Sequence, residues 1–177
     1  MKSIIKWAEE NYACGPAREW LSKSIGNSPK KAWEQCNNLT WLLWGLENLN
    51  TIPHKYQVAA CLVCAEGVAH KNVEIKESCK LVRRWLNSKI SINVLRDVGD
   101  IAHNDVARRL LNFATRKFSY FRMSDVIYPV TNERNEHVDY GYNDSAYVGV
   151  DKECCHRIRA VIPWSMVKDL YIKSCSK

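Results

Sequence analysis

Two groups of cysteines have residue types and spacings that could do chemistry. Cys61 and Cys64 are separated by two residues, which is the spacing of a redox pair or of half a zinc site. They lie among apolar residues at helical spacing, whereas a redox pair belongs at the start of a helix, where the helix dipole stabilises a thiolate. We therefore expect Cys61, Cys64 and Cys79 to be reduced residues of the core.

The second group is Cys154-Cys155-His156. Neighbouring residues of a helix point about 100° apart, so two adjacent cysteines rarely bind one metal ion. Cys14 has no local signature that pairs it with one of the five histidines as a base, and His103 beside Asp100 is explained as well by a solvated helix face as by an acid–base pair. We expect no metal, no cofactor and no catalytic centre, and we predict a protein that is not an enzyme.

The elements that carry these residues are predicted to be helices. Residues 39–46 are apolar on nearly every side, which a buried helix tolerates, and 54–70 read as a second central helix. Ser28-Pro29 has the cap residue and first-turn proline of a helix start. The clearest amphipathic pattern runs over 92–118 as one helix. We predict an all-α fold, a compact helical bundle or stacked helix pairs of about seven to eight helices in a single domain, 1–177.

The pattern changes over residues 119–150, where aromatic and β-branched residues alternate with turn residues and helical periodicity fails. The sequence favours an irregular Tyr-rich loop or a small hairpin here. Loops of this length in a compact domain are commonly functional, so this segment is the best local candidate for specificity.

Positive charge is concentrated in the middle of the chain. Residues 71–120 contain eleven lysines and arginines against five acids, a net charge of +6 within a total of +7. This surface suits an acidic protein, a nucleotide or a nucleic acid, and the alternative is a solvated helix face with partial internal charge balance. Together with the Tyr-rich segment it defines our candidate partner-binding residues: Arg83, Arg84, Arg108, Arg109, Arg116, Lys117, Tyr120, Tyr128, Tyr140 and Tyr142.

No run in the sequence approaches the roughly 20 apolar residues that cross a bilayer. The first residues reach Glu9 and Glu10 before a hydrophobic segment develops, unlike a secretion signal. We therefore expect a cytoplasmic protein with no membrane partner.

Several short motifs resemble a group of small, all-helical bacterial and phage proteins labelled immunity proteins. The likeness is strongest over residues 7–70 and covers about half of the chain. It is carried by Ala13-Cys14, Ala17-Arg18-Glu19-Trp20-Leu21, Ala32-Trp33-Glu34-Gln35-Cys36, Trp41-Leu42-Leu43-Trp44, Ala59-Ala60-Cys61 and Cys64-Ala65. The resemblance implies an all-α fold and a protein that neutralises a toxin, or in a phage a host defence protein, by binding it.

The leading hypothesis is a non-enzymatic binding protein, an immunity-like or phage counter-defence inhibitor that acts by protein–protein interaction. The alternative is a binder or sponge of an anionic ligand, a nucleic acid or nucleotide messenger, through the basic helical face. A metal-dependent or cysteine-dependent enzyme is the third hypothesis.

Overall fold

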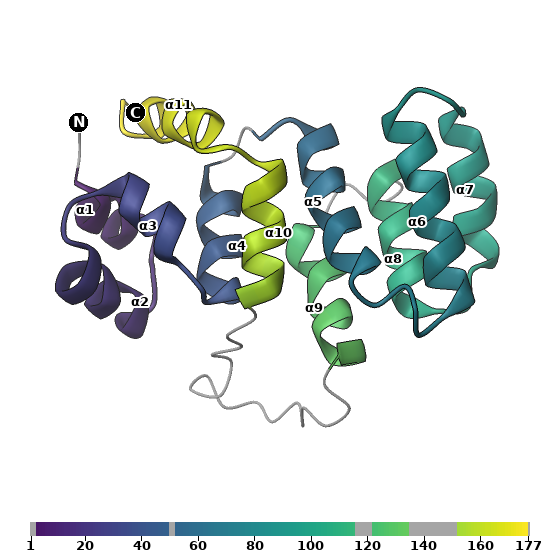
Figure 1. Cartoon of the computed structure of the whole chain (residues 1–177). Helices are drawn as coiled ribbons and strands as arrows, with labels where there is room; N and C mark the ends of the chain where they lie inside the picture. The colour runs from purple at the N-terminus through teal and green to yellow at the C-terminus, as the bar shows by residue number, and fades with distance from the viewer. Residues whose placement is uncertain (1–2, 50–51, 116–121, 135–151, 177) are drawn as a thin grey trace. The chain divides into compact units, whose positions relative to one another are not determined.

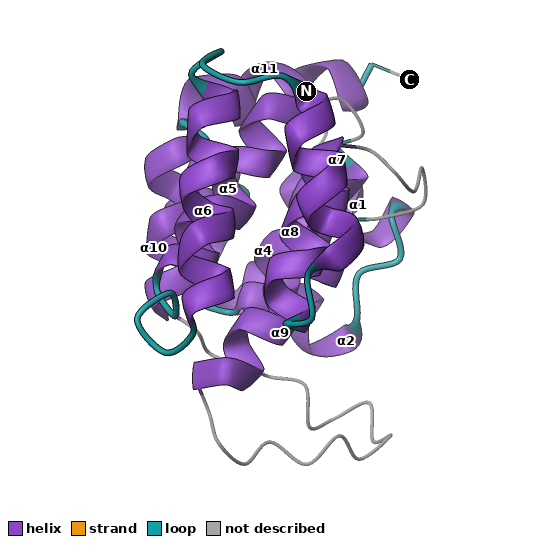
Figure 2. Ribbon diagram, turned by 90° about the vertical axis from the view of Figure 1, so that its right-hand side faces the viewer, coloured by secondary structure: helices purple, strands orange, loops and turns teal. Residues whose placement is uncertain are grey.

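The computed structural model describes residues 3–49, 52–115, 122–134 and 152–176. Within these ranges the regular structure is helical, with eleven α-helices, one π-helical turn and no strand (Figure 2). The predicted all-α class is confirmed, but the expected number of seven to eight helices is too low, because turns divide the apolar stretches into shorter helices. The chain divides into two compact units: unit 1 comprises residues 1–52 and 148–177, and unit 2 comprises residues 53–147.

Unit 1 contains seven helical elements from the two ends of the chain (Figure 1). Helix α10 packs against α4, and α11 packs against α3, so the C-terminal helices complete the N-terminal ones. The elements are α1 (Ile4–Glu10), α2 (Gly15–Trp20), the π-helical turn η1 (Leu21–Ile25), α3 (Pro29–Gln35), α4 (Leu39–Asn48), α10 (Lys152–Val161) and α11 (Trp164–Ser174).

Local capping explains why the helices of unit 1 are short. The Ser28 hydroxyl accepts a hydrogen bond from the Lys31 N–H at 3.2 Å, and Pro29 occupies the first helical position, which confirms the predicted start. The Asn38 side chain does the same for α4 by accepting the Trp41 N–H at 3.1 Å. Gly26 ends η1 at φ +64°, a conformation that disfavours any side chain.

Arg159 of α10 binds the C-terminal end of α3. Its guanidinium donates to the Cys36 carbonyl oxygen at 2.6 Å and to the Trp33 carbonyl oxygen at 3.4 Å. These carbonyls end the helix and have no helical donor, and a cation also suits the negative end of the helix dipole. Arg159 thus joins segments more than 120 residues apart in the sequence.

Unit 2 is built around α8, which packs against four other helices. Its last six residues, from Leu110 to Thr115, are all buried. The unit contains α5 (His54–Glu66), α6 (Val73–Leu86), α7 (Ile92–Ile101), α8 (Asp105–Thr115) and α9 (Met123–Arg134).

The prediction of one helix over residues 92–118 is wrong. The chain leaves the helix after Ile101 and starts α8 at Asp105, so the apolar pattern belongs to two helices that pack on each other. Glu74 of α6 stabilises the break, because one carboxylate oxygen accepts the N–H groups of His103 at 2.9 Å and Asn104 at 2.7 Å. The Asn104 side chain then caps α8 by accepting the Ala107 N–H at 3.0 Å.

The expected irregular segment at 119–150 is wrong over Met123–Arg134, which form α9. Met123, Val126, Ile127 and Val130 recur at helical spacing and are buried. Pro129, inside the helix, and the β-branched residues concealed this periodicity. The rest of that segment, except Arg122, lies outside the described residues.

None of the eight cysteines, all of which are described, forms a disulfide. Cys61, Cys64 and Cys79 are buried in unit 2, as predicted. Among the described helices none has both the length and the apolarity required to cross a membrane.

Candidate functional site: a tryptophan-lined pocket in unit 1

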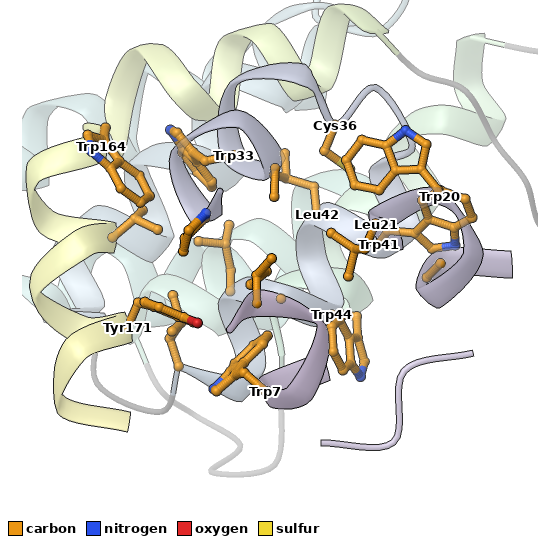
Figure 3. A pocket seen from close by; sticks show the side chains of 18 residues that line it. Trp7, Trp20, Leu21, Trp33, Cys36, Trp41, Leu42, Trp44, Trp164 and Tyr171 are labelled. Atoms are coloured by element: carbon orange, nitrogen blue, oxygen red, sulfur yellow. The ribbon is translucent and has the colours of Figure 1, made fainter. Parts of the chain in front are cut away.

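The most distinctive surface feature of unit 1 is a pocket lined almost wholly by apolar side chains (Figure 3). Six of the seven tryptophans of the chain contribute to it, and they come from five different helices. They are Trp7 of α1, Trp20 of α2, Trp33 of α3, Trp41 and Trp44 of α4, and Trp164 of α11.

Contacts between aromatic rings fix the positions of several side chains that line the pocket. Trp7 lies edge-on to Trp44 at a centroid distance of 5.5 Å and to Tyr171 of α11 at 5.9 Å. Trp20 and Trp41 form a separate pair at 5.7 Å. Such pairs stabilise by roughly 0.5–1.5 kcal/mol beyond the area they bury. The walls are therefore aromatic surfaces fixed by their neighbours.

The tryptophans differ in exposure. Trp7 and Trp33 are buried, at 5% and 7% exposed, and serve as core residues. Trp20, Trp41, Trp44 and Trp164 are partly exposed. The seven tryptophans of the sequence predict core anchors for most of them, but only Trp7 and Trp33 are buried. The other four in the pocket leave part of a large apolar side chain in contact with water, a composition typical of binding hot spots.

Gly45 keeps part of this pocket open. It lies inside α4, where glycine is about 1 kcal/mol less favourable than alanine. A Cβ atom added at Gly45 would meet no atom within 4 Å, so close packing does not require the glycine. Its backbone does not need the left-handed conformation either. The structural consequence of the missing side chain is space in the pocket.

The size and chemistry of the pocket define what it could bind. Its volume is about 100 Å³, whereas pockets that enclose drug-sized ligands typically measure roughly 300–1,000 Å³. None of the described residues that line it has a charged side chain. A pocket of this kind accepts one small apolar group, such as a partner's side chain, and lacks the convergent polar groups that orient a metabolite.

The two ionisable side chains in the lining stay neutral at ordinary pH. Burial raises the pKa of the Cys36 thiol to about 11. Burial, followed by a hydrogen bond with Cys175, also raises the pKa of the Tyr171 phenol above its usual value. A thiol with a raised pKa is a poor nucleophile. These groups therefore contribute packing surface to the pocket rather than charge.

The arginines that the sequence predicts to bind a partner belong to unit 2. Three of them form ion pairs with acidic residues of the chain. Arg83 pairs with Glu66 at the end of α5, and this contact raises the pKa of the guanidinium. Arg108 and Arg109 pair with the same carboxylate, Asp105, at 2.7 and 2.6 Å. Such pairs leave less positive charge for an anionic ligand than the sequence suggests.

Arg84 is exposed on α6, and no ion pair of Arg84 is found among the described residues. Tyr128 is partly exposed on α9, and the Arg109 guanidinium donates to the Asp125 carbonyl oxygen of the same helix at 3.3 Å. The structure thus places Arg109 beside the helix that carries Tyr128. The remaining candidates, Arg116, Lys117, Tyr120, Tyr140 and Tyr142, lie outside the described residues.

Cys61 and Cys64 lie in the middle of α5 and not at its start, where a dipole would favour a thiolate. Within the described part of the chain, no group of three or more histidine, cysteine, aspartate or glutamate residues is placed to hold a metal ion.

Sequence reasoning missed the tryptophan pocket as a site. The sequence is rich in tryptophan, with seven residues, but nothing in their spacing predicts that six of them meet, because α11 follows α4 by more than 100 residues. Gly45 inside an otherwise apolar helix was the one available signal.

Comparison with protein-family models, with curated proteins and with solved structures finds no match for this chain.

Proposed function

We propose that the chain is a non-enzymatic binding protein that acts by forming a complex with another protein, one of whose apolar side chains enters the tryptophan-lined pocket of unit 1. The observation that carries this proposal is the open apolar volume beside Gly45, bordered by partly exposed tryptophans. Buried pockets ringed by aromatic residues are where the energy of protein–protein association concentrates.

The volume of the pocket and the free energy gained by filling it favour a protein partner over a small molecule. A pocket of about 100 Å³ encloses one aliphatic side chain, and fully burying such a side chain contributes roughly 1.5–3 kcal/mol. That energy alone is too small for stable binding. Further contact must come from the surrounding surface, which a protein supplies and a small ligand does not.

The class of partner that we propose follows from the likeness to immunity proteins, which implies a toxin or, in a phage, a host defence protein. Capture of such a protein in a stoichiometric complex requires no catalytic group. In the competing hypothesis, an anionic ligand on the basic face would have to displace Glu66 and Asp105, which already pair with Arg83, Arg108 and Arg109.

Native mass spectrometry of the protein purified from its own host tests this proposal when it is combined with substitutions in the pocket. Wild type should carry a protein partner at fixed stoichiometry. Gly45→Leu should lose that partner, because the new side chain occupies the pocket. The variant should keep its fold, since the space at Cβ is open and leucine favours helix.

Ile101→Ala is the matched control, because Ile101 is an apolar side chain of unit 2 that is 71% exposed and lies outside the pocket. It should retain the partner. If Gly45→Leu binds the same partner as tightly as wild type, the pocket is not the binding site. A nucleotide or nucleic acid as the bound species in wild type would overturn the proposal in favour of the anionic ligand.

A further inference from the structure

The charges beside the pocket are distributed unevenly on the helices that line it. On α11 the lining residues are Trp164, Val167 and Tyr171. Lys168 follows Trp164 by four residues and precedes Tyr171 by three, so it lies on the same face of the helix. Lys168 is exposed. On this spacing, Lys168 borders the residues of α11 that line the pocket.

Two more basic residues are spaced three positions from a residue that lines the pocket. Lys30 precedes Trp33 by three residues on α3, and Arg18 precedes Leu21 by three at the junction of α2 and η1. Both are exposed. Lys30 makes a loose, exposed ion pair with Glu34 at 3.7 Å, whereas the ion pairs found among the described residues include neither Arg18 nor Lys168. Exposed pairs of that kind stabilise little and exchange readily with a new partner.

The acids on these three elements do not have that spacing to the lining residues, although Glu34 pairs with Lys30. Glu19, Glu34 and Asp169 have no lining residue at a spacing of three or four on their own element. Two acids of α1 and α4, Glu10 and Glu47, do follow lining tryptophans by three residues, and both already interact within the chain.

The sequence segments of unit 1 together contain twelve lysines and arginines against eight acids, a net charge of +4. Unit 1 as a whole is therefore positively charged.

We infer that the occupant of the pocket is an apolar side chain from an acidic segment of the partner protein, with carboxylates placed to meet Lys168, Arg18 and Lys30. This inference rests on the proposed function and specifies the chemistry of the partner. An aromatic pocket is also the usual site for a quaternary ammonium group, but the three cations at its edge repel such a ligand. The same cations attract carboxylates, which increases the association rate and selects the orientation of the partner.

Two synthetic helical peptides without tryptophan test the inference on the full-length protein. Both carry the same leucine stripe at i, i+3, i+4 and i+7, and the flanking positions are glutamate in one peptide and lysine in the other. Binding is measured by the fluorescence of the pocket tryptophans. The glutamate peptide should bind about tenfold more tightly at low salt, and the difference should shrink as the Debye length falls below about 10 Å.

Lys168→Glu should remove much of that preference and leave binding of a third peptide, with serine at the flanking positions, unchanged. Asp169→Lys is the matched control, because residue 169 lies away from the pocket face of α11. It should preserve the preference for the glutamate peptide over the lysine peptide.

The outcomes separate this inference from the proposed function. If both charged peptides bind equally and Gly45→Leu abolishes both, the pocket binds apolar side chains and the acidic partner is wrong. Tighter binding of the lysine peptide overturns the inference as well. If none of the peptides binds, the inference fails, whereas the proposed function is decided by whether Gly45→Leu loses the native partner.

Discussion

The two units use a glycine inside a helix for opposite purposes. In unit 2, a Cβ atom at Gly99 of α7 would lie 3.2 Å from both the Asn112 Oδ1 and the Leu111 Cβ of α8, so the glycine permits close packing of two helices. In unit 1, a Cβ atom at Gly45 would meet nothing within 4 Å, and the glycine leaves open space beside tryptophans. Unit 2 is thus organised for dense packing around α8, whereas unit 1 combines a core with an open aromatic pocket.

The largest effect is expected at Gly99. Valine there forces its branched side chain against α8, and overpacking of this kind typically lowers stability by about 3 kcal/mol or less. Chemical denaturation followed by circular dichroism should show this loss. Six of the seven tryptophans are in unit 1, so tryptophan fluorescence should change less than circular dichroism as the destabilised unit 2 unfolds. If the Gly99→Val variant has the same denaturation curve as the wild-type protein, α7 and α8 do not pack closely at Gly99.

Arg159→Met should destabilise unit 1 by about 2–3 kcal/mol, because it removes charged hydrogen bonds to the carbonyl oxygens at the end of α3. Methionine keeps much of the apolar stem, so the loss reports on the guanidinium. Tryptophan fluorescence during thermal unfolding should record it. Arg157→Met is the control, since Arg157 pairs with Glu153 of its own helix. An equal loss there would contradict the capping role of Arg159.

Alkaline pH should destabilise unit 1 through Cys36. Its pKa is raised from 9.0 to about 11 in the folded chain, so its contribution to stability is complete below pH 9 and disappears as the pH rises to about 11. The loss amounts to about 2 kcal/mol. Denaturation series at pH 8 and pH 11 should show a smaller decrease for Cys36→Ala than for wild type. The same decrease in both proteins would indicate that the thiol is not buried in solution.

Gly45→Ala should raise the stability of unit 1 by about 1 kcal/mol, because alanine favours the helix and its methyl group enters open space. Thermal unfolding followed by tryptophan fluorescence measures the change. The direction is opposite to that expected for Gly99→Val. A decrease in stability would mean that the pocket beside α4 is closed in solution.

The smallest effects are expected just after α1 in unit 1 and just after α6 in unit 2, where the backbone adopts the same left-handed conformation. Tyr12 follows α1 at φ +61°, and Ser88 follows α6 at φ +57°, both at positions where glycine is preferred. Glycine at either position should raise stability by about 0.5–1 kcal/mol. Tyr12 is 92% exposed, so little packing is lost there. A decrease with Tyr12→Gly would show that the ring makes a stabilising contact.

The sequence by itself determined the helical class, the start of α3 at Ser28-Pro29 and the burial of Cys61, Cys64 and Cys79. These features follow from apolar periodicity and from hydrogen bonds between residues a few positions apart, which local sequence encodes. Pro129 shows the limit of such reasoning, because a helix breaker concealed a helix whose buried residues have regular spacing.

Tertiary structure decided the rest. Glu74 ends α7 and supports α8 from about thirty positions away, and Asp105 reduces the charge available from Arg108 and Arg109. The pocket forms because α11 packs against α3 in unit 1 and brings Trp164 and Tyr171 to tryptophans more than 100 positions earlier. The spacing of residues along a chain defines the faces of one helix, but it does not specify which distant faces meet.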